Sequence, residues 1–227
     1  MSLSPGTRLG AYEIKSVAGA GGMGEVYRAV DTRLDRIVAI KVMPGHIAAA
    51  PESRQRFERE ARTVASLNHP NICTLYDLGH EDSSPEMEHG VDYLVMEFLD
   101  GVTLEQRLRT GALPVAQALH IGIQIAEALT AAHRAGVVHR DLKPGNVMLT
   151  RAGARLLDFG LARTVSSATG ADATAADRTS LTTQGTLLGT LHYMAPEQLD
   201  GREVDTRADV FAFGAVLYEM VTGLKAF

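Results

Sequence analysis

A polar cluster past the middle of the chain has the residue types that proton transfer and phosphoryl transfer need. It reads His139-Arg-Asp141-Leu-Lys143-Pro-Gly-Asn146. The carboxylate of Asp141 can accept the proton of a substrate hydroxyl, and Lys143 can neutralise charge on a phosphoryl group in transfer. Asn146 offers a carbonyl oxygen to a hard cation such as Mg²⁺. Taken singly, each of these residues would be interpreted as part of a capped turn.

A second acidic motif, Asp158-Phe159-Gly160, supplies the carboxylate that such a cation needs. Its glycine leaves the backbone free to swing. Because these residues follow one another in a chain that also carries a glycine loop and a strand lysine, they predict a site for a metal and a phosphate.

The glycine loop reads Gly19-Ala20-Gly21-Gly22-Met-Gly24-Glu-Val26. Alone, this pattern is weak evidence and is also typical of a glycine-rich hairpin. A dinucleotide fingerprint needs a helix after the glycines, whereas GEVYRAV continues as a strand. A strand–loop–strand instead lets backbone amides lie over phosphates, because glycine has no Cβ. Val26 is then expected to pack on the base.

A lysine on the next strand, Lys41 in the sequence VAIK, is flanked by apolar residues and is expected to point into a cleft. Its ammonium would bind phosphate oxygens and needs a carboxylate to hold its charge in place. Glu60, in the expected helix that follows, is the first candidate. Glu58 is the alternative, since Glu60 lies closer to the apolar face of that helix.

Periodicity and turn residues divide the chain into a β-rich first part and a helical second part. Strands are expected at 11–19, 24–30, 36–43, 72–80 and 91–99, and helices at 51–67, 103–109, 115–135 and 209–222. Short extended pieces surround the polar cluster. Residues 162–189 are poor in hydrophobic residues and rich in Ala, Ser, Thr and Gly, a composition typical of a mobile segment.

The composition excludes several classes of protein. With 45% hydrophobic and 22% charged residues, the chain of 227 residues is an ordinary globular mix. The net charge of −5 argues against a nucleic-acid partner, although a local basic groove stays open. Cys73 is the single cysteine, so no intrachain disulfide forms, which favours the cytoplasm. No signal peptide and no membrane segment is expected within these residues.

The chain resembles the protein kinase family. The glycine loop, VAIK, HRDLKPGN, DFG and Ala195-Pro196-Glu197 occur in the family's order and spacing from about Tyr12 to Phe227. The resemblance implies an α+β, bilobal protein-kinase fold, with a β-rich N-lobe, a mainly helical C-lobe and ATP in the cleft. The implied organisation is an N-terminal extension (1–11), N-lobe (12–98), hinge (99–101) and C-lobe (102–227), with an activation segment at 158–197.

The resemblance also implies roles for single residues. Lys41 would bind the α- and β-phosphates with Glu60 as its partner, and Asp141 would be the catalytic base. Asn146 and Asp158 would bind Mg²⁺, which Mn²⁺ could replace. The residues implied around the adenine are Val26, Ala39, Met96 as gatekeeper, Glu97, Leu99 and Met148. An apolar spine linking the lobes would consist of Val64, Leu75, His139 and Phe159.

Lys143 directly after Asp141-Leu142 resembles the Ser/Thr branch, and Thr190 would brace both charged residues. The wording PGTRLGAYEI, LNHPNI and APEQL resembles the bacterial Ser/Thr kinases. Arg140 would pair with a phosphate on the activation segment. We expect autophosphorylation at one or more of Thr182, Thr183 and Thr186. The alternative is that these threonines are only part of a linker.

Two departures from the family pattern stand out. Phe211 occupies a place where the family usually has Trp, while Asp209 is still expected to hold the backbone of the polar cluster. The chain stops at Phe227, where relatives continue through several more helices, and the arginine that pairs with Glu197 would lie beyond that point. We therefore expect a truncated C-lobe with weak or no activity alone. A sensor domain or membrane anchor could lie beyond residue 227.

The expected partners are ATP and protein substrates with Ser or Thr hydroxyls, in signal transduction, and a transient homodimer for autophosphorylation. Two other classes of function stay open. One is a pseudokinase, which would bind ATP or a partner without transfer; the intact Lys41, Asp141, Asn146 and Asp158 argue against it. The other is a small-molecule kinase, against which the APE segment and the long activation segment argue.

Overall fold

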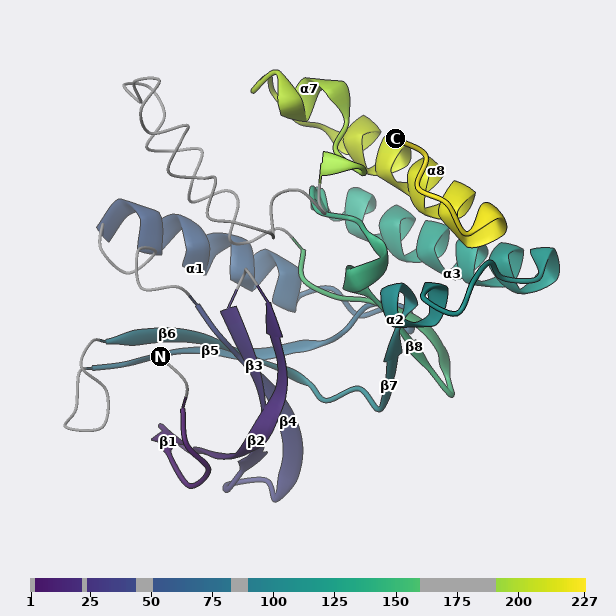
Figure 1. Cartoon of the computed structure of the whole chain (residues 1–227). Helices are drawn as coiled ribbons and strands as arrows, with labels where there is room; N and C mark the ends of the chain where they lie inside the picture. The colour runs from purple at the N-terminus through teal and green to yellow at the C-terminus, as the bar shows by residue number, and fades with distance from the viewer. Residues whose placement is uncertain (1–2, 22–23, 44–50, 83–89, 160–190) are drawn as a thin grey trace. The chain divides into compact units, whose positions relative to one another are not determined.

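The computed structural model describes residues 3–21, 24–43, 51–82, 90–159 and 191–227. The chain forms two compact units. Among the described residues, the first unit contains those within 3–66 and 74–99, and the second contains 67–73, 100–159 and 191–227. The first unit is mostly strand and the second mostly helix (Figure 1). The expected α+β class, with a β-rich N-terminal part and a helical C-terminal part, is therefore confirmed.

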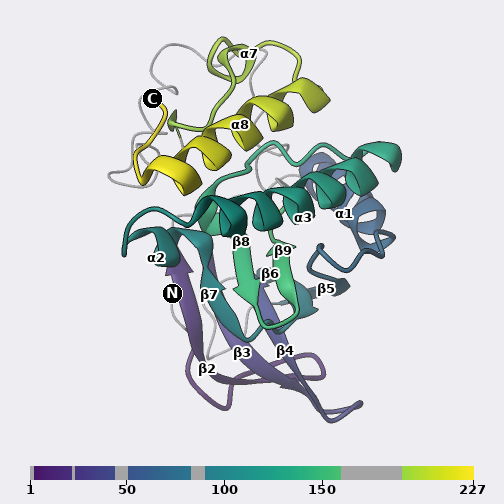
Figure 2. The same cartoon turned by 90° about the vertical axis from the view of Figure 1, so that its right-hand side faces the viewer.

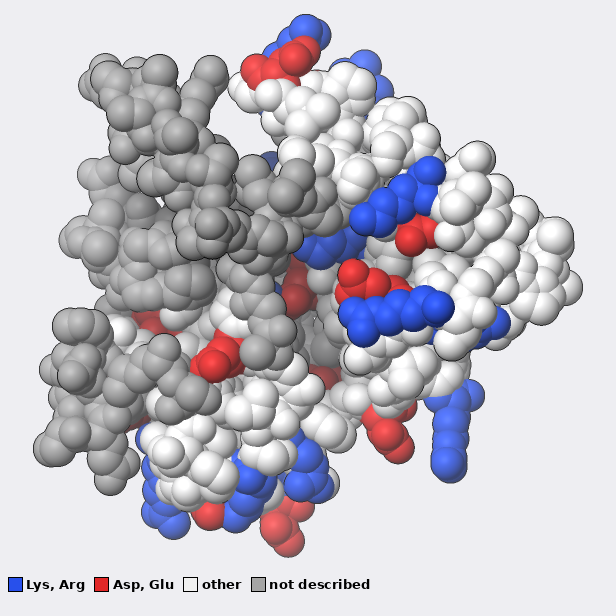
Figure 3. Space-filling model, in the orientation of Figure 1, with Lys and Arg blue, Asp and Glu red and all other residues white. Residues whose placement is uncertain are grey.

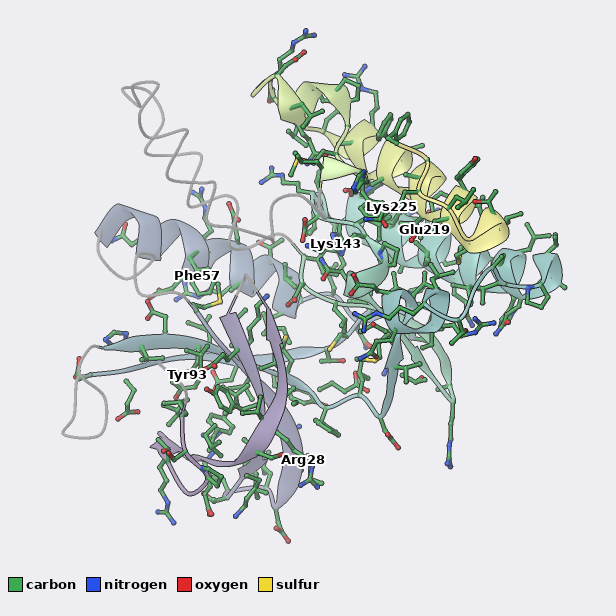
Figure 4. All side chains as sticks on the ribbon, in the orientation of Figure 1. Arg28, Phe57, Tyr93, Lys143, Glu219 and Lys225 are labelled. Carbon is green, nitrogen blue, oxygen red and sulfur yellow. The ribbon has the colours of Figure 1, made fainter. Side chains whose placement is uncertain are left out.

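The first unit is a six-stranded antiparallel sheet in the order β1-β2-β3-β4-β6-β5. Its strands are β1 (Arg8–Leu9), β2 (Tyr12–Gly21), β3 (Gly24–Asp31), β4 (Arg36–Val42), β5 (Leu75–Glu81) and β6 (Val91–Glu97), and its helix is α1 (Pro51–Ala65). The helix contacts β5. Its buried face consists of Phe57 (labelled in Figure 4), Ala61 and Val64, as the spacing of apolar residues predicts.

The two faces of this sheet differ in character. One face carries a core cluster of buried residues, including Tyr27, Ile40 and Val95. Leu3 and Leu9 pack into the same cluster, and the Leu3 N–H donates to the Tyr27 hydroxyl at 2.8 Å. The segment expected as an N-terminal extension thus contributes two buried leucines to the core.

The second unit contains a three-stranded sheet in the order β7-β8-β9 and two long helices. Its elements are β7 (Gly101–Thr103), α2 (Leu104–Leu108), α3 (Val115–Arg134), the 3-10 turn η1 (Pro144–Asn146), β8 (Val147–Thr150), β9 (Gly153–Leu156), α7 (Pro196–Leu199) and α8 (Thr206–Thr222). Helix α3 contacts β9 and α8 (Figure 2). It is thus the central helix of this unit, buried through residues such as Ile121, Ile125 and Leu129.

Three local features differ from the expected elements. Strand β7 was not expected, and it forms because Gly101 meets β8 at very short range: a Cβ at this position would lie 2.2 Å from the carbonyl oxygen of Leu149. Strand β1 was not expected either, since it has only two residues. Helix α8 begins before the expected residue 209, because the Asp205 side chain accepts a hydrogen bond from the Arg207 N–H and caps it at 2.9 Å.

The described surface shows no block of one charge on the face drawn in Figure 3, where acidic and basic side chains are interspersed. None of the described helices is both long enough and apolar enough to span a bilayer.

Candidate active site

The backbone of the polar cluster is held by Asp209, a carboxylate in the first turn of α8 that is only 1% exposed. The His139 N–H donates to Oδ2 and the Arg140 N–H donates to Oδ1, both at 2.8 Å. The His133 Nε2 lies 2.7 Å from Oδ2. The expectation that Asp209 anchors this backbone is therefore confirmed, and His133 of α3 is an additional partner that sequence reasoning missed.

His139 lies at the centre of the cluster and is fully buried. Its Nδ1 accepts the Asp141 N–H at 3.3 Å, so the proton is on Nε2, which donates to the Leu157 carbonyl at 2.9 Å. Burial lowers the pKa of His139, although nearby carboxylates oppose this. The ring lies 4.8 Å from the ring of Phe159, centroid to centroid. A neutral imidazole thus connects the polar cluster to the segment that carries Asp158.

Two residues of the site have a left-handed backbone although neither is glycine. The φ of Arg140 is 62° and that of Asp158 is 50°. Such conformations cost free energy and are maintained by surrounding contacts, often at functional sites. Arg140 directly precedes the expected base Asp141, and Asp158 is itself an expected metal ligand. Both unusual conformations are therefore at residues that set the direction of a side chain with an expected chemical role.

Asp141 is surrounded by the other polar residues of its motif and is 4% exposed. Its Oδ2 lies 2.9 Å from the Nζ of Lys143, which is labelled in Figure 4. The Asn146 Nδ2 donates to the Asp141 carbonyl at 2.8 Å and to its Oδ2 at 2.9 Å. The structure therefore brings Asp141, Lys143 and Asn146 together, as their spacing predicts.

The residues expected to bind metal lie at one end of a hairpin. Strands β8 and β9 pair Val147 with Leu156, and the Leu157 N–H donates to the Asn146 carbonyl at 2.9 Å. Since both hydrogens of the Asn146 amide point to Asp141, its oxygen is directed elsewhere and suits a hard cation, as the Asp158 carboxylate does. No group of three or more His, Cys, Asp or Glu in the described ranges could hold a metal. One amide oxygen and one carboxylate suit a cation that completes its shell with phosphate oxygens and water.

In the first unit, the residues expected near the nucleotide share one face of the sheet. Val26 pairs with Lys41, and Ala39 pairs with Met96. Since paired residues in a sheet point to the same side, and residues two apart do too, these four lie on the face opposite the core cluster of Tyr27, Ile40 and Val95. Lys41 is 5% exposed there.

The glycine loop closes as a hairpin. Gly19 pairs with Val26, Ala20 with Glu25 and Gly21 with Gly24. The φ of Gly24 is 115°, which a residue with a Cβ rarely adopts. Gly22 lies outside the described residues.

The segment expected to bind adenine through its backbone follows the end of β6. The Glu97 N–H donates to the Thr74 carbonyl at 2.9 Å, so it is engaged within the first unit. Leu99 lies after the strand and is partly buried. In the second unit, Met148 on β8 is opposite Thr103 and Arg155 and is also partly buried.

The two carboxylates considered as partners of Lys41 lie on α1. Glu58 Oε2 lies 3.5 Å from the Nη2 of Arg62, one turn further along the same helix. The choice of Glu60 over Glu58 as the partner of Lys41 stays a prediction.

Several contacts near the site were not foreseen. Gln198 of α7 bonds to the carbonyl of Arg140, and Tyr193 donates a hydrogen bond to Glu219. Burial raises the pKa of Tyr193, and the hydrogen bond to Glu219 raises it further. The sequence around Gln198 and Tyr193 contains no motif that predicts either contact. The residues expected to be regulatory, Thr182, Thr183, Thr186 and Thr190, lie outside the described residues.

The sequence matches the family described as the protein kinase domain over residues 12–227. It is 44% identical over 215 residues to a probable serine/threonine-protein kinase of Streptomyces coelicolor, covering 94% of this chain and 30% of the relative. It is 41% identical over 218 residues to the serine/threonine-protein kinase PknB of Mycobacterium leprae, covering 95% and 33%. It is 41% identical over 223 residues to the serine/threonine-protein kinase PknA of Mycobacterium tuberculosis, covering 97% of this chain and 49% of the relative. The chain thus spans 30–49% of these relatives' lengths.

The fold is similar to a solved structure, the kinase domain of PknI from Mycobacterium tuberculosis. The TM-score is 0.75 at 28% sequence identity, and the match covers 100% of this chain and 80% of that one.

Proposed function

This chain belongs to the protein kinase family, and from that premise we propose that it transfers the γ-phosphate of ATP to Ser or Thr hydroxyls of proteins. The observation that carries the proposal is the environment of Asp141. Its carboxylate lies 2.9 Å from the Lys143 ammonium and accepts from the Asn146 amide, which holds it in one orientation. A base so fixed can accept a hydroxyl proton without first reorganising.

Lys143 has a second role in this proposal. Its ammonium stabilises negative charge on the phosphoryl group in transfer, and its contact with Asp141 keeps it beside the base. Most of the catalysis is therefore positioning and charge neutralisation, since phosphoryl transfer leaves little covalent chemistry for the protein.

Nucleotide binding is assigned to the first unit and to Met148. Lys41, with Glu60 as its partner, binds the α- and β-phosphates under the backbone amides of the glycine loop. The adenine packs against Val26, Ala39 and Met148, and Met96 lies behind it. The polar edge of the adenine binds to the backbone at Glu97 and Leu99. The shared sheet face of Val26, Ala39, Lys41 and Met96 supports this assignment.

A divalent cation is assigned to Asn146 and Asp158. Mg²⁺ takes few protein ligands when it also binds phosphates, which suits one amide oxygen and one carboxylate. The cation would supply charge neutralisation between phosphate groups, and Mn²⁺ has a compatible preference for oxygen ligands.

Regulation by autophosphorylation is the finer part of the proposal. Arg140 would receive a phosphate carried by Thr182, Thr183 or Thr186, and Thr190 would contact Asp141 and Lys143. A phosphothreonine adds nearly two negative charges and orders a segment through bonds to arginine. Mapping phosphosites after incubation with MgATP tests this, and sites found only outside 164–190 would contradict it.

The transfer itself is tested with labelled ATP, Mg²⁺ and a generic protein substrate, comparing the chain with its Asp158→Asn variant. We expect label on protein that is lost in the variant, because the variant lacks a metal-binding carboxylate. Binding of ATP without transfer by the unmodified chain would instead indicate a scaffold.

A further inference from the structure

Gln198, in the short helix α7, connects the segment around Ala195 to the polar cluster. Its Nε2 donates to the backbone carbonyl of Arg140 at 2.9 Å, and its Oε1 accepts the N–H of Ala195 at 3.0 Å. All three residues belong to the second unit. One side chain therefore bonds to two backbone segments that lie far apart in the sequence.

The direction of both bonds is fixed by chemistry. A backbone carbonyl can only accept and a backbone N–H can only donate, so the amide of Gln198 has one orientation that satisfies both. A carboxylate at this position could still accept from Ala195, but its other oxygen would face the Arg140 carbonyl, acceptor against acceptor. An amide is thus the group that both partners require.

The bonded carbonyl belongs to the peptide that precedes Asp141. Arg140 has a left-handed backbone, with φ of 62°, and its N–H is already bound by Asp209. The same peptide plane contains the N–H of Asp141, which donates to His139. Rotating this peptide would break both the bond to Gln198 and the bond to His139, so Gln198 acts on the orientation from which the Asp141 side chain projects.

We propose that Gln198 is a positioning residue for Asp141, and that it couples the placement of α7 to the orientation of the catalytic base. The inference rests on the proposed transfer reaction. Gln198 does not touch the reacting atoms; it acts through the Arg140–Asp141 peptide. Loss of the bond to Arg140 is expected to lower the turnover number and to leave the KM for ATP unchanged, because the nucleotide is bound by other residues.

The chain contains a matched control for this test. Gln106 of α2 also accepts a backbone N–H at a helix start, that of Thr103 at 2.9 Å, but no bond from it to the polar cluster is present among the described contacts. Gln106→Glu therefore makes the same chemical change in the same local setting. Any effect common to Gln198→Glu and Gln106→Glu belongs to the helix start alone.

The experiment measures phosphate transfer by the whole chain and its two variants. We expect Gln198→Glu to lower kcat about tenfold near pH 8, the order expected for a lost hydrogen bond with an opposed acceptor, and Gln106→Glu to stay within about twofold. As the pH falls towards about 5.5, the ratio of Gln198→Glu to unmodified kcat should rise, because a protonated carboxyl can donate to the Arg140 carbonyl as the amide does. A purely structural effect would not follow this pH dependence.

A second measurement is independent of activity. Hydrogen exchange of the amides of His139, Arg140 and Asp141 should be faster in Gln198→Glu and unchanged in Gln106→Glu. If the two variants agree in kcat, pH dependence and exchange, the inference is overturned. If the unmodified chain transfers no phosphate, the proposed function fails instead, and the exchange rates still decide whether Gln198 holds the peptide.

Discussion

Asn146 gives both hydrogens of its amide to Asp141, one to the backbone carbonyl at 2.8 Å and one to the carboxylate at 2.9 Å. Two bonds to one residue fix the carboxylate relative to its own backbone. They also fix which side of the Asn146 amide presents its oxygen. One contact thus prepares both the proposed base and the proposed metal ligand.

Asn146→Ala removes both functions together. We expect kcat to fall about 100-fold, since positioning and charge stabilisation at the site are both lost, and half-maximal activity to need more Mg²⁺. Steady-state rates at several Mg²⁺ concentrations measure this. An unchanged Mg²⁺ requirement would contradict the proposed metal role of Asn146.

Asp209→Asn tests the anchor of the polar cluster. Asp209 accepts from two backbone N–H groups and lies 2.7 Å from the His133 imidazole, and an amide would turn a donor towards one of these groups. We expect the free energy of unfolding to fall by about 3 kcal/mol in urea titrations.

Asp205→Asn is the matched control for that anchor, because it makes the same change at the cap of the same helix. Asn caps a helix about as well as Asp, and the ion pair of Asp205 with Arg207 is exposed, so the loss should be much smaller than for Asp209→Asn. Equal losses in the two variants would show that Asp209 has no special role as an anchor.

Gly101→Ala tests the close approach of β7 to β8. A Cβ would lie 2.2 Å from the Leu149 carbonyl oxygen, so we expect a loss of about 1–3 kcal/mol of stability.

Gly214→Ala is the opposite case. Apart from the backbone of α8 itself, no atom of the described residues lies within 4 Å of a Cβ there, so we expect a gain of about 0.5–1 kcal/mol. Thermal denaturation measures the stability of both variants. A Gly101→Ala variant as stable as the unmodified chain would contradict the close approach of β7 to β8.

The buried His139 predicts a pH dependence of stability. Its pKa is lowered in the folded chain from the ordinary value of 6.5, so the unfolded chain takes up a proton first as the pH falls. The contribution of His139 is therefore fully present above pH 6.5 and is lost progressively below it, by at most about 1.4 kcal/mol per pH unit. Imidazole resonances followed by NMR should show His139 still neutral when exposed histidines have titrated. A midpoint at or above 6.5 would contradict the assignment.

The sequence predicted those parts of the site in which chemistry and spacing coincide. Asp141, Lys143 and Asn146 lie within one short turn, so their proximity follows from the chain itself. The shared face of Val26, Ala39 and Lys41 follows from strand periodicity. Asp209 was also predicted, although only through the family resemblance, because nothing local indicates which backbone it binds.

Other features depend on contacts between segments far apart in the chain. Gln198 has the appearance of an ordinary helix-start residue, and its bond to Arg140 depends on where α7 packs. Leu3 and Leu9 belong to a segment without a clear hydrophobic periodicity, and they are buried because they pack on the apolar face of the sheet. Periodicity reports a residue's neighbours along one element, so it could not predict these contacts.

The most direct test of the central claim compares the chain with Asp141→Asn in the presence of labelled ATP, Mg²⁺ and a protein substrate. We expect label on Ser and Thr of the substrate, and a rate reduced at least about 100-fold in the variant, because the amide cannot act as a base. Nucleotide binding should persist, since Asp141 is not assigned to it. Equal, measurable rates for the two proteins would contradict the account.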